Sequence, residues 1–117
     1  MAATANPTLL DPIQLFRVSD VTTSDVTQYT APNEAGVRIA KCIVVNKTTS
    51  AVTLRFWRET TGGAIAYICF DFTIPGSGIP VVIPIDGALL LPQEELHTDA
   101  GTGSALDMWC DGWELKD

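Results

Sequence analysis

The single histidine of the chain lies in an acidic stretch, EELHTD (residues 94–99), where it could take part in chemistry. An imidazole beside Glu94, Glu95 and Asp99 could bind a metal ion or form an acid–base pair. Zinc sites need several nitrogen or sulfur ligands at regular spacings, but the sequence has no CxxC or HxxxH pair. Calcium would accept these carboxylates, but no glycine-containing EF-hand loop is present. The pattern around His97 therefore favours a solvated loop, and we expect neither a metal nor another cofactor.

The other residues that could support catalysis lack the context that catalysis needs. A Ser–His–Asp triad assembles in space, so residue spacing alone does not test for one, but the sequence has no GxSxG motif. Cys42 lacks the neighbours that mark cysteine hydrolases. Gly62-Gly63 and the Gly-Thr-Gly of residues 101–103 do not precede helical sequence, so they lack the helix N-terminus that binds phosphate. We therefore predict no catalytic residue, and an enzyme is the least favoured class.

The three tryptophans are candidates for binding. Trp57 falls on the polar side of its predicted strand, and Trp109 and Trp113 lie near the end of the chain. Exposed tryptophans can stack on sugars or anchor a protein interface. The alternative is that they pack beneath loops or under an N-terminal arm.

Composition and charge restrict the partners of the chain. The net charge of −7 should repel a phosphate backbone or an anionic lipid surface, so we expect neither nucleic acid nor membrane as a partner. No apolar run is long enough to span a bilayer, and the first twelve residues lack the pattern of a secretory signal. Cys42, Cys69 and Cys110 are expected to be buried, reduced thiols; one pair could form a disulfide, but a reducing compartment argues against it.

The apolar pattern predicts an all-β fold. Short runs rich in β-branched and aromatic residues alternate with turn signals, and no helical period appears. We expect about eight strands in an antiparallel β-sandwich of jelly-roll or Ig-like type. Residues 1–12 read as an extended N-terminal arm, and residues 13–117 read as one domain. The expected strands are 13–18, 21–30, 38–46, 52–58, 65–74, 79–85, 96–100 and 105–115, with a glycine bulge or bend at Gly112.

The predicted strand of residues 38–46 is apolar on both of its faces. Alternation places Ile39, Ile43 and Val45 on one side. It places Ala40, Cys42 and Val44 on the other. A strand with one wet face should alternate apolar and polar residues, so we expect both faces of this strand to be covered.

Short motifs follow one another between residues 26 and 115. They are YTAP (29–32), the strand of residues 39–46, TTSAVTL (48–54), FTIPG (72–76), the DG…LP segment (86–92) and the closing strand (105–115). Together they resemble a group of small bacteriophage virion proteins with a YTVPAG start, a strand ending in NTT and an IPAG turn. One departure is that Gln93-Glu94-Glu95 stands where those proteins usually have Gly-Asp.

The resemblance implies a β-sandwich module of a phage particle. It implies a structural role as capsid decoration (cement), head-fibre base or tail component and does not choose among these. The interpretation we favour is a capsid decoration protein that binds the outer capsid surface, stabilises the head and is assembled in the host cytoplasm. The implied partners are the major capsid protein and copies of the chain itself, as a homotrimer. The alternative is a tail or head-fibre module that binds a host glycan or a fibre partner. The candidate interface residues are Ala40, Cys42, Val44, Trp57, Trp109 and Trp113.

Overall fold

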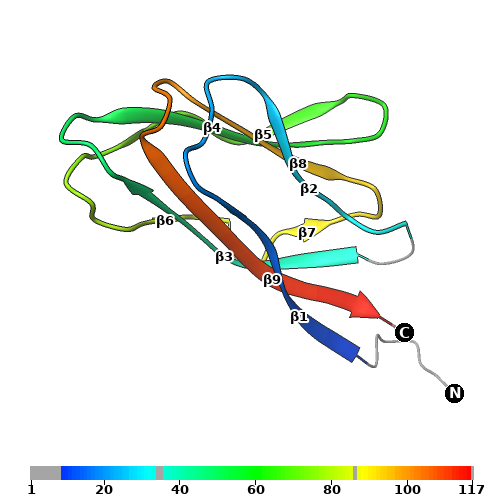
Figure 1. Cartoon of the computed structure of the whole chain (residues 1–117). Helices are drawn as coiled ribbons and strands as arrows, with labels where there is room; N and C mark the ends of the chain where they lie inside the picture. The colour runs from blue at the N-terminus through cyan, green and yellow to red at the C-terminus, as the bar shows by residue number, and fades with distance from the viewer. Residues whose placement is uncertain (1–8, 34–35, 86, 117) are drawn as a thin grey trace, which may run out of the picture.

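The computed structural model describes residues 9–33, 36–85 and 87–116, and these form nine strands and no helix. Two antiparallel sheets pack face to face (Figure 1). The predicted all-β antiparallel fold is therefore confirmed. The strands are β1 (Leu9–Val18), β2 (Val26–Thr30), β3 (Gly36–Asn46), β4 (Val52–Glu59), β5 (Ile65–Ile74), β6 (Val81–Ile83), β7 (Leu89–Leu90), β8 (Glu95–Ala100) and β9 (Leu106–Lys116).

The five-stranded sheet has the order β1-β9-β3-β6, with β7 pairing to β3, and the four-stranded sheet has the order β2-β8-β4-β5. The long strand β9 pairs with β1 on one side and with β3 on the other. Strand β1 begins at Leu9, inside the segment predicted as an arm, while residues 1–8 lie outside the described part of the chain. Within the described residues, no helix is long and apolar enough to cross a membrane.

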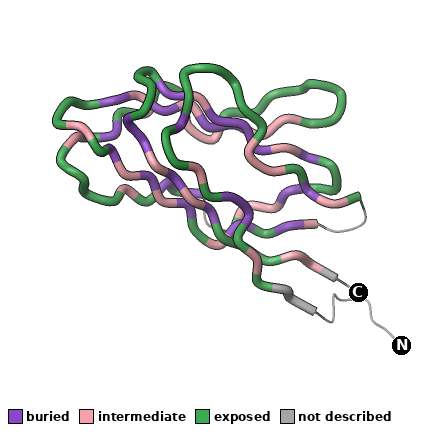
Figure 2. The backbone as a smooth tube through the Cα atoms, in the orientation of Figure 1, coloured by how far each residue is buried: buried purple, intermediate pink, exposed green. Residues whose placement is uncertain are grey.

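The core lies between the two sheets, where each strand contributes alternate side chains. Buried and exposed residues alternate along most strands (Figure 2). The rings of Phe16 and Phe56 meet edge to face at the centre of this layer, with centroids 6.1 Å apart. Each fully buried large apolar side chain contributes about 1.5–3 kcal/mol, so the core carries most of the stability. Its largest fully buried members include Phe56, Ile39, Leu54, Ile74, Ile83, Leu90, Leu96, Leu106 and Met108.

A one-residue bulge in β3 decides which of its side chains enter the core. The pairing of β3 with β9 shifts between Ile39 and Lys41, so Ala40 is an extra residue. Beyond the bulge, Cys42 and Val44 point into the core and are fully buried.

The predicted surface position of Cys42 and Val44 is therefore wrong. The bulge reverses the alternation, so the outward residues of β3 after it are Lys41, Ile43 and Val45. Ala40 itself is partly exposed at the bulge.

The bulge predicted at Gly112 is absent from β9 itself. Two bulges lie near this glycine instead, one in each of the strands that flank β9. Gly112 pairs with Ile39 and Ile13, and the extra residues lie in the neighbouring strands β3 and β1. A Cβ atom on Gly112 would lie only 2.4 Å from the carbonyl oxygen of Arg38. The close approach of β3 to β9 therefore requires a glycine at this point.

We predict that Gly112→Ala destabilises the fold by roughly 1–3 kcal/mol, because the added methyl group meets rigid backbone. The free energy of unfolding in urea measures the effect. Gly62→Ala is the matched control, since its nearest atom, the Thr60 hydroxyl oxygen, lies 3.9 Å away. Equal unfolding midpoints for the two variants would contradict the role assigned to Gly112.

Candidate functional site

His97 lies on the outer face of the four-stranded sheet, on strand β8. Its cross-strand neighbours are Thr27 of β2 and Trp57 of β4. The expected strand near residues 96–100 is confirmed, but the expected solvated position of His97 is wrong, since the residue is only 5% exposed. The neighbouring strands β2 and β4 cover the His97 side chain, and the sequence around residue 97 does not show this cover.

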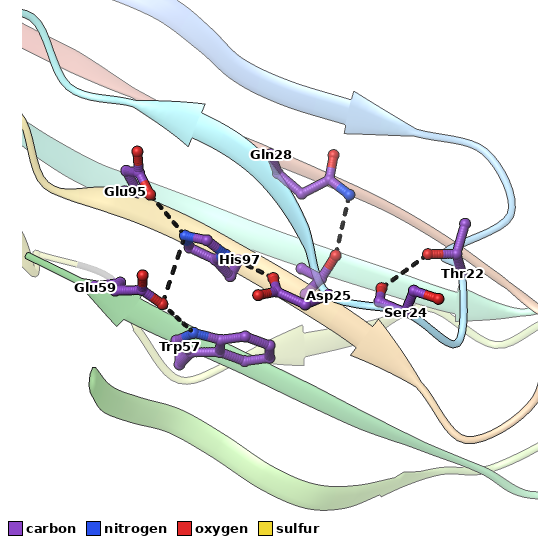
Figure 3. A network of polar contacts seen from close by, with 9 residues as sticks. Thr22, Ser24, Asp25, Gln28, Trp57, Glu59, Glu95 and His97 are labelled. Atoms are coloured by element: carbon purple, nitrogen blue, oxygen red, sulfur yellow. Dashed lines mark hydrogen bonds and ion pairs between the residues drawn. The ribbon is translucent and has the colours of Figure 1, made fainter. Parts of the chain in front are cut away.

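Three carboxylates from different parts of the chain surround the imidazole (Figure 3). Asp25 Oδ1 lies 2.6 Å from Nδ1, and Glu95 Oε1 lies 2.8 Å from Nε2. Glu59 Oε1 is a further neighbour, 3.8 Å from Nε2. Since a carboxylate can only accept, the ring satisfies both close contacts as an imidazolium that donates from each nitrogen.

The surroundings of His97 favour its charged form. Burial alone lowers the pKa of the imidazole. The hydrogen bonds to Asp25 and Glu95, together with the negative charges of Asp25 and Glu59, outweigh burial and raise the pKa above its usual value. The cluster therefore acts as an ion-pair network that ties β4 and β8 to the segment leading into β2.

Trp57 completes this network and is covered by it. Its indole ring stacks on the His97 ring with centroids 5.5 Å apart and an interplanar angle of 17°. Its Nε1 donates to Glu59 Oε1 over 3.3 Å, and Tyr67 packs on it at 5.6 Å. Trp57 lies on the outward side of β4, as predicted, but it is only 4% exposed, so its ring is not open to a sugar.

The chemistry open to this cluster is limited by its own hydrogen bonds. Asp25, Glu59 and His97 offer ligand atoms within 4.8 Å of one another, a mixed nitrogen and oxygen set that suits a divalent cation. A metal at Nε2 must first replace the proton that faces Glu95. In the protonated form the ring has no free lone pair for a substrate or a metal.

The acidic residues that flank His97 in sequence divide between two places. Glu94 lies outside the cluster and pairs with Arg58, with its carboxylate oxygens 2.6 and 2.9 Å from the guanidinium. Arg58 lowers the pKa of Glu94 and also donates to the Leu89 carbonyl at 2.8 Å. Asp99 stays on the outer face of β8, opposite Arg55. Sequence reasoning missed Asp25 and Glu59, because they come from distant segments.

The six predicted interface residues occupy three separate places. Trp109 and Trp113 lie on the outer face of the five-stranded sheet, where Trp113 is 38% exposed. Ala40 and Trp113 line a shallow hollow of about 340 Å³ beside Gln14 and Asp111. Cys42 and Val44 lie in the core, and Trp57 lies on the opposite sheet. The six therefore do not form one surface.

The three cysteines are free thiols. Cys42 and Cys110 face each other across β3 and β9 and are fully buried, while Cys69 is partly buried. The hydrogen bond with Cys110, followed by burial, raises the pKa of the Cys42 thiol. Burial raises the pKa of the Cys69 thiol to about 11.

Comparison with known proteins found no matching family model, no significantly similar curated protein and no significantly similar solved structure. The function is therefore argued from the residues and geometry of this chain.

We predict that His97 titrates above pH 6.5 in the folded protein, since Asp25 and Glu95 hold its proton. Because the pKa of His97 is raised in the folded state, the charged imidazole stabilises the fold fully below pH 6.5. This stabilisation is lost as the pH rises through the folded-state pKa. The chain has one histidine, so NMR reports this imidazole without overlap. Asp25→Asn should lower the midpoint, whereas Asp111→Asn on the other sheet should not. A wild-type midpoint at or below 6.5 would refute the imidazolium.

We predict that none of the thiols reacts readily in the folded protein near neutral pH. Raised pKa values keep the thiolates of Cys42 and Cys69 scarce, and Cys110 is fully buried out of reach of a reagent. A thiol reagent followed by absorbance should modify Cys69 first and all three cysteines only after unfolding. Cys69→Ser removes the first phase. Rapid modification of Cys42 in the native state would contradict its position in the core.

Proposed function

We propose that this chain is a structural protein of a bacteriophage particle, a capsid decoration (cement) protein that binds the outer capsid surface and stabilises the head. The observation that carries the proposal is the apolar outer face of the five-stranded sheet. Ile43, Val45 and Trp109 are only partly covered there, and Val82 and Trp113 are exposed. Val82, Ile43 and Trp109 are cross-strand neighbours, and an exposed apolar surface of this kind is typical of a protein interface.

The motifs that resemble phage virion proteins have physical roles in this fold. Asn46 is fully buried, and its amide donates to the carbonyls of Ser50 (2.7 Å) and Ile74 (3.0 Å) while its Oδ1 accepts from the Thr48 backbone. Gly76 packs on this turn so closely that a Cβ would lie 2.6 Å from the Thr49 carbonyl carbon. The NTT-like and IPAG-like motifs therefore contact each other and together hold the turn after β3 against β5.

The charge of the chain supports a place on the outside of the particle. A net charge of −7 opposes contact with packaged DNA. Burial of apolar surface contributes about 25 cal/mol per Å² at each contact, and symmetry repeats the contact around the capsid. Many weak contacts can thus stabilise a head.

A glycan-binding tail or head-fibre module is the second candidate, and one observation favours it. Tyr67 and Phe70 form an exposed aromatic pair with ring centroids 4.8 Å apart. The Arg55 guanidinium lies 4.5 Å from the Phe70 centroid and is bonded to Asp71 at 2.7 Å. Aromatic rings beside polar groups are typical of sugar sites, and this pair replaces the tryptophans as the candidate.

We predict that cryo-electron microscopy of the particle locates the chain on the outer head surface in many symmetry-related copies. Trp113→Ala with Val82→Ser should lower its occupancy, because the change removes apolar contact area. Ile79→Ser is the control, since Ile79 is even more exposed but lies in the loop between β5 and β6. Unchanged occupancy would count against this face as the contact, and density on the tail would favour the glycan-binding module.

A further inference from the structure

The outer face of the five-stranded sheet combines an apolar centre with cations. Arg17, Trp109, Ile43 and Val82 form one row across β1, β9, β3 and β6. Arg38 and Lys41 also lie on this side and are exposed. Its carboxylates are Asp111, opposite Lys41, and the pair Asp20 and Asp107, which both bind the Lys47 amine. We call this surface the five-strand face.

The outer face of the four-stranded sheet has the opposite charge. We call it the four-strand face; it carries five carboxylates, those of Asp25, Glu59, Asp71, Glu95 and Asp99. The cations among them are Arg55 and the His97 imidazolium. At its β5 edge the apolar side chains of Ile65, Tyr67 and Phe70 are each about half exposed.

From this complementarity we infer that copies of the chain associate through two different faces, the five-strand face of one copy resting on the four-strand face of the next. The cations of the first face then meet the carboxylates of the second, and the apolar centre meets Tyr67 and Phe70. A contact between two four-strand faces would oppose five carboxylates to five, which costs free energy. A contact between unlike faces is heterologous, so it either closes into a ring or continues as a rod.

The five-strand face is large enough for such a contact. Strands β3 and β9 each have 11 residues. At about 3.3 Å per residue and about 4.8 Å between strands, the five strands of this sheet together present on the order of 600 Å², the lower end of the range for a stable interface. A standard interface buries roughly 800 Å² per partner. The charges are exposed, so salt should weaken the contact.

This contact does not depend on the proposed function. A closed ring would cover every five-strand face, whereas an open rod leaves the five-strand face of its first copy free for the capsid contact proposed above. The capsid proposal and the contact between copies can be tested, and can fail, separately. A chain that self-associates but does not bind heads would count against the capsid proposal alone. A monomer that binds heads would count against the contact between copies alone.

The test is sedimentation velocity with one variant for each face. Arg17→Glu with Lys41→Glu reverses the charge of the five-strand face. Phe70→Ser with Asp71→Asn removes apolar area and charge from the four-strand face, and asparagine tolerates the positive φ of 51° at residue 71. Thr61→Glu, in the exposed turn after β4, is the control for added negative charge.

At low ionic strength we expect oligomers of the wild type and of Thr61→Glu, and monomers of each face variant. Oligomers should dissociate between about 50 mM and about 0.5 M salt as screening increases. An equimolar mixture of the two face variants should form dimers and nothing larger, because it contains one intact face of each kind per pair. This stop at two copies is specific to a heterologous contact.

Three results would overturn the inference. They are a wild type that stays monomeric at low salt, face variants that remain oligomeric, and a mixture that stays monomeric while the wild type associates. If circular dichroism shows that a charge-reversed variant does not fold, Arg17→Ala with Lys41→Ala replaces it. Arg17 and Lys41 are exposed, so their truncation removes charge without opening the core.

Discussion

The close approach of the β3 backbone to Gly112 of β9 is the constraint on which the five-stranded sheet depends. Strand β3 gains one residue next to this glycine and β1 gains one opposite Asp111 and Cys110, while β9 continues without interruption between them. Each extra residue exchanges the inward and outward positions of its strand. As a result Ile39 and Cys42 both face the core, and Lys41 and Ile43 face out. The core and the outer face of this sheet therefore both follow from the bulges.

Regular alternation in the sequence predicted the strands that have no such interruption. Along β4, Val52, Leu54 and Phe56 point inward and Arg55 and Trp57 outward, which agrees with the predicted side of Trp57. In β3 the predicted inward and outward positions were wrong after Ala40. The strand is apolar on both sides, so its sequence does not show where a bulge exchanges the two sides. In β5 the pairing with β4 shifts twice, so alternation along this strand does not show that Phe70 is exposed. Bulges depend on the partner strand, so one strand's pattern cannot locate them.

The same limit applies to the network around His97. Its neighbour in sequence, Glu95, was visible as a candidate partner, but Asp25 and Glu59 reach the ring only because β2 and β4 flank β8. The covering of Trp57 by His97 and Tyr67 likewise requires three adjacent strands. Among the described residues every buried side-chain nitrogen and oxygen has a hydrogen-bond partner. The predicted loop histidine is thus a structural part of the sheet.

Two polar side chains join the sheets at opposite ends of β3. Asn46, at the end of β3, binds the Ile74 carbonyl of the other sheet. Near the start of β3, Arg58 of β4 binds the Leu89 carbonyl of β7 and the carboxylate of Glu94. Neither sheet can slide or peel from the other without breaking bonds at both ends. Hydrogen exchange in the core of the two sheets should therefore proceed through one cooperative opening, with the sandwich behaving as a single foldon.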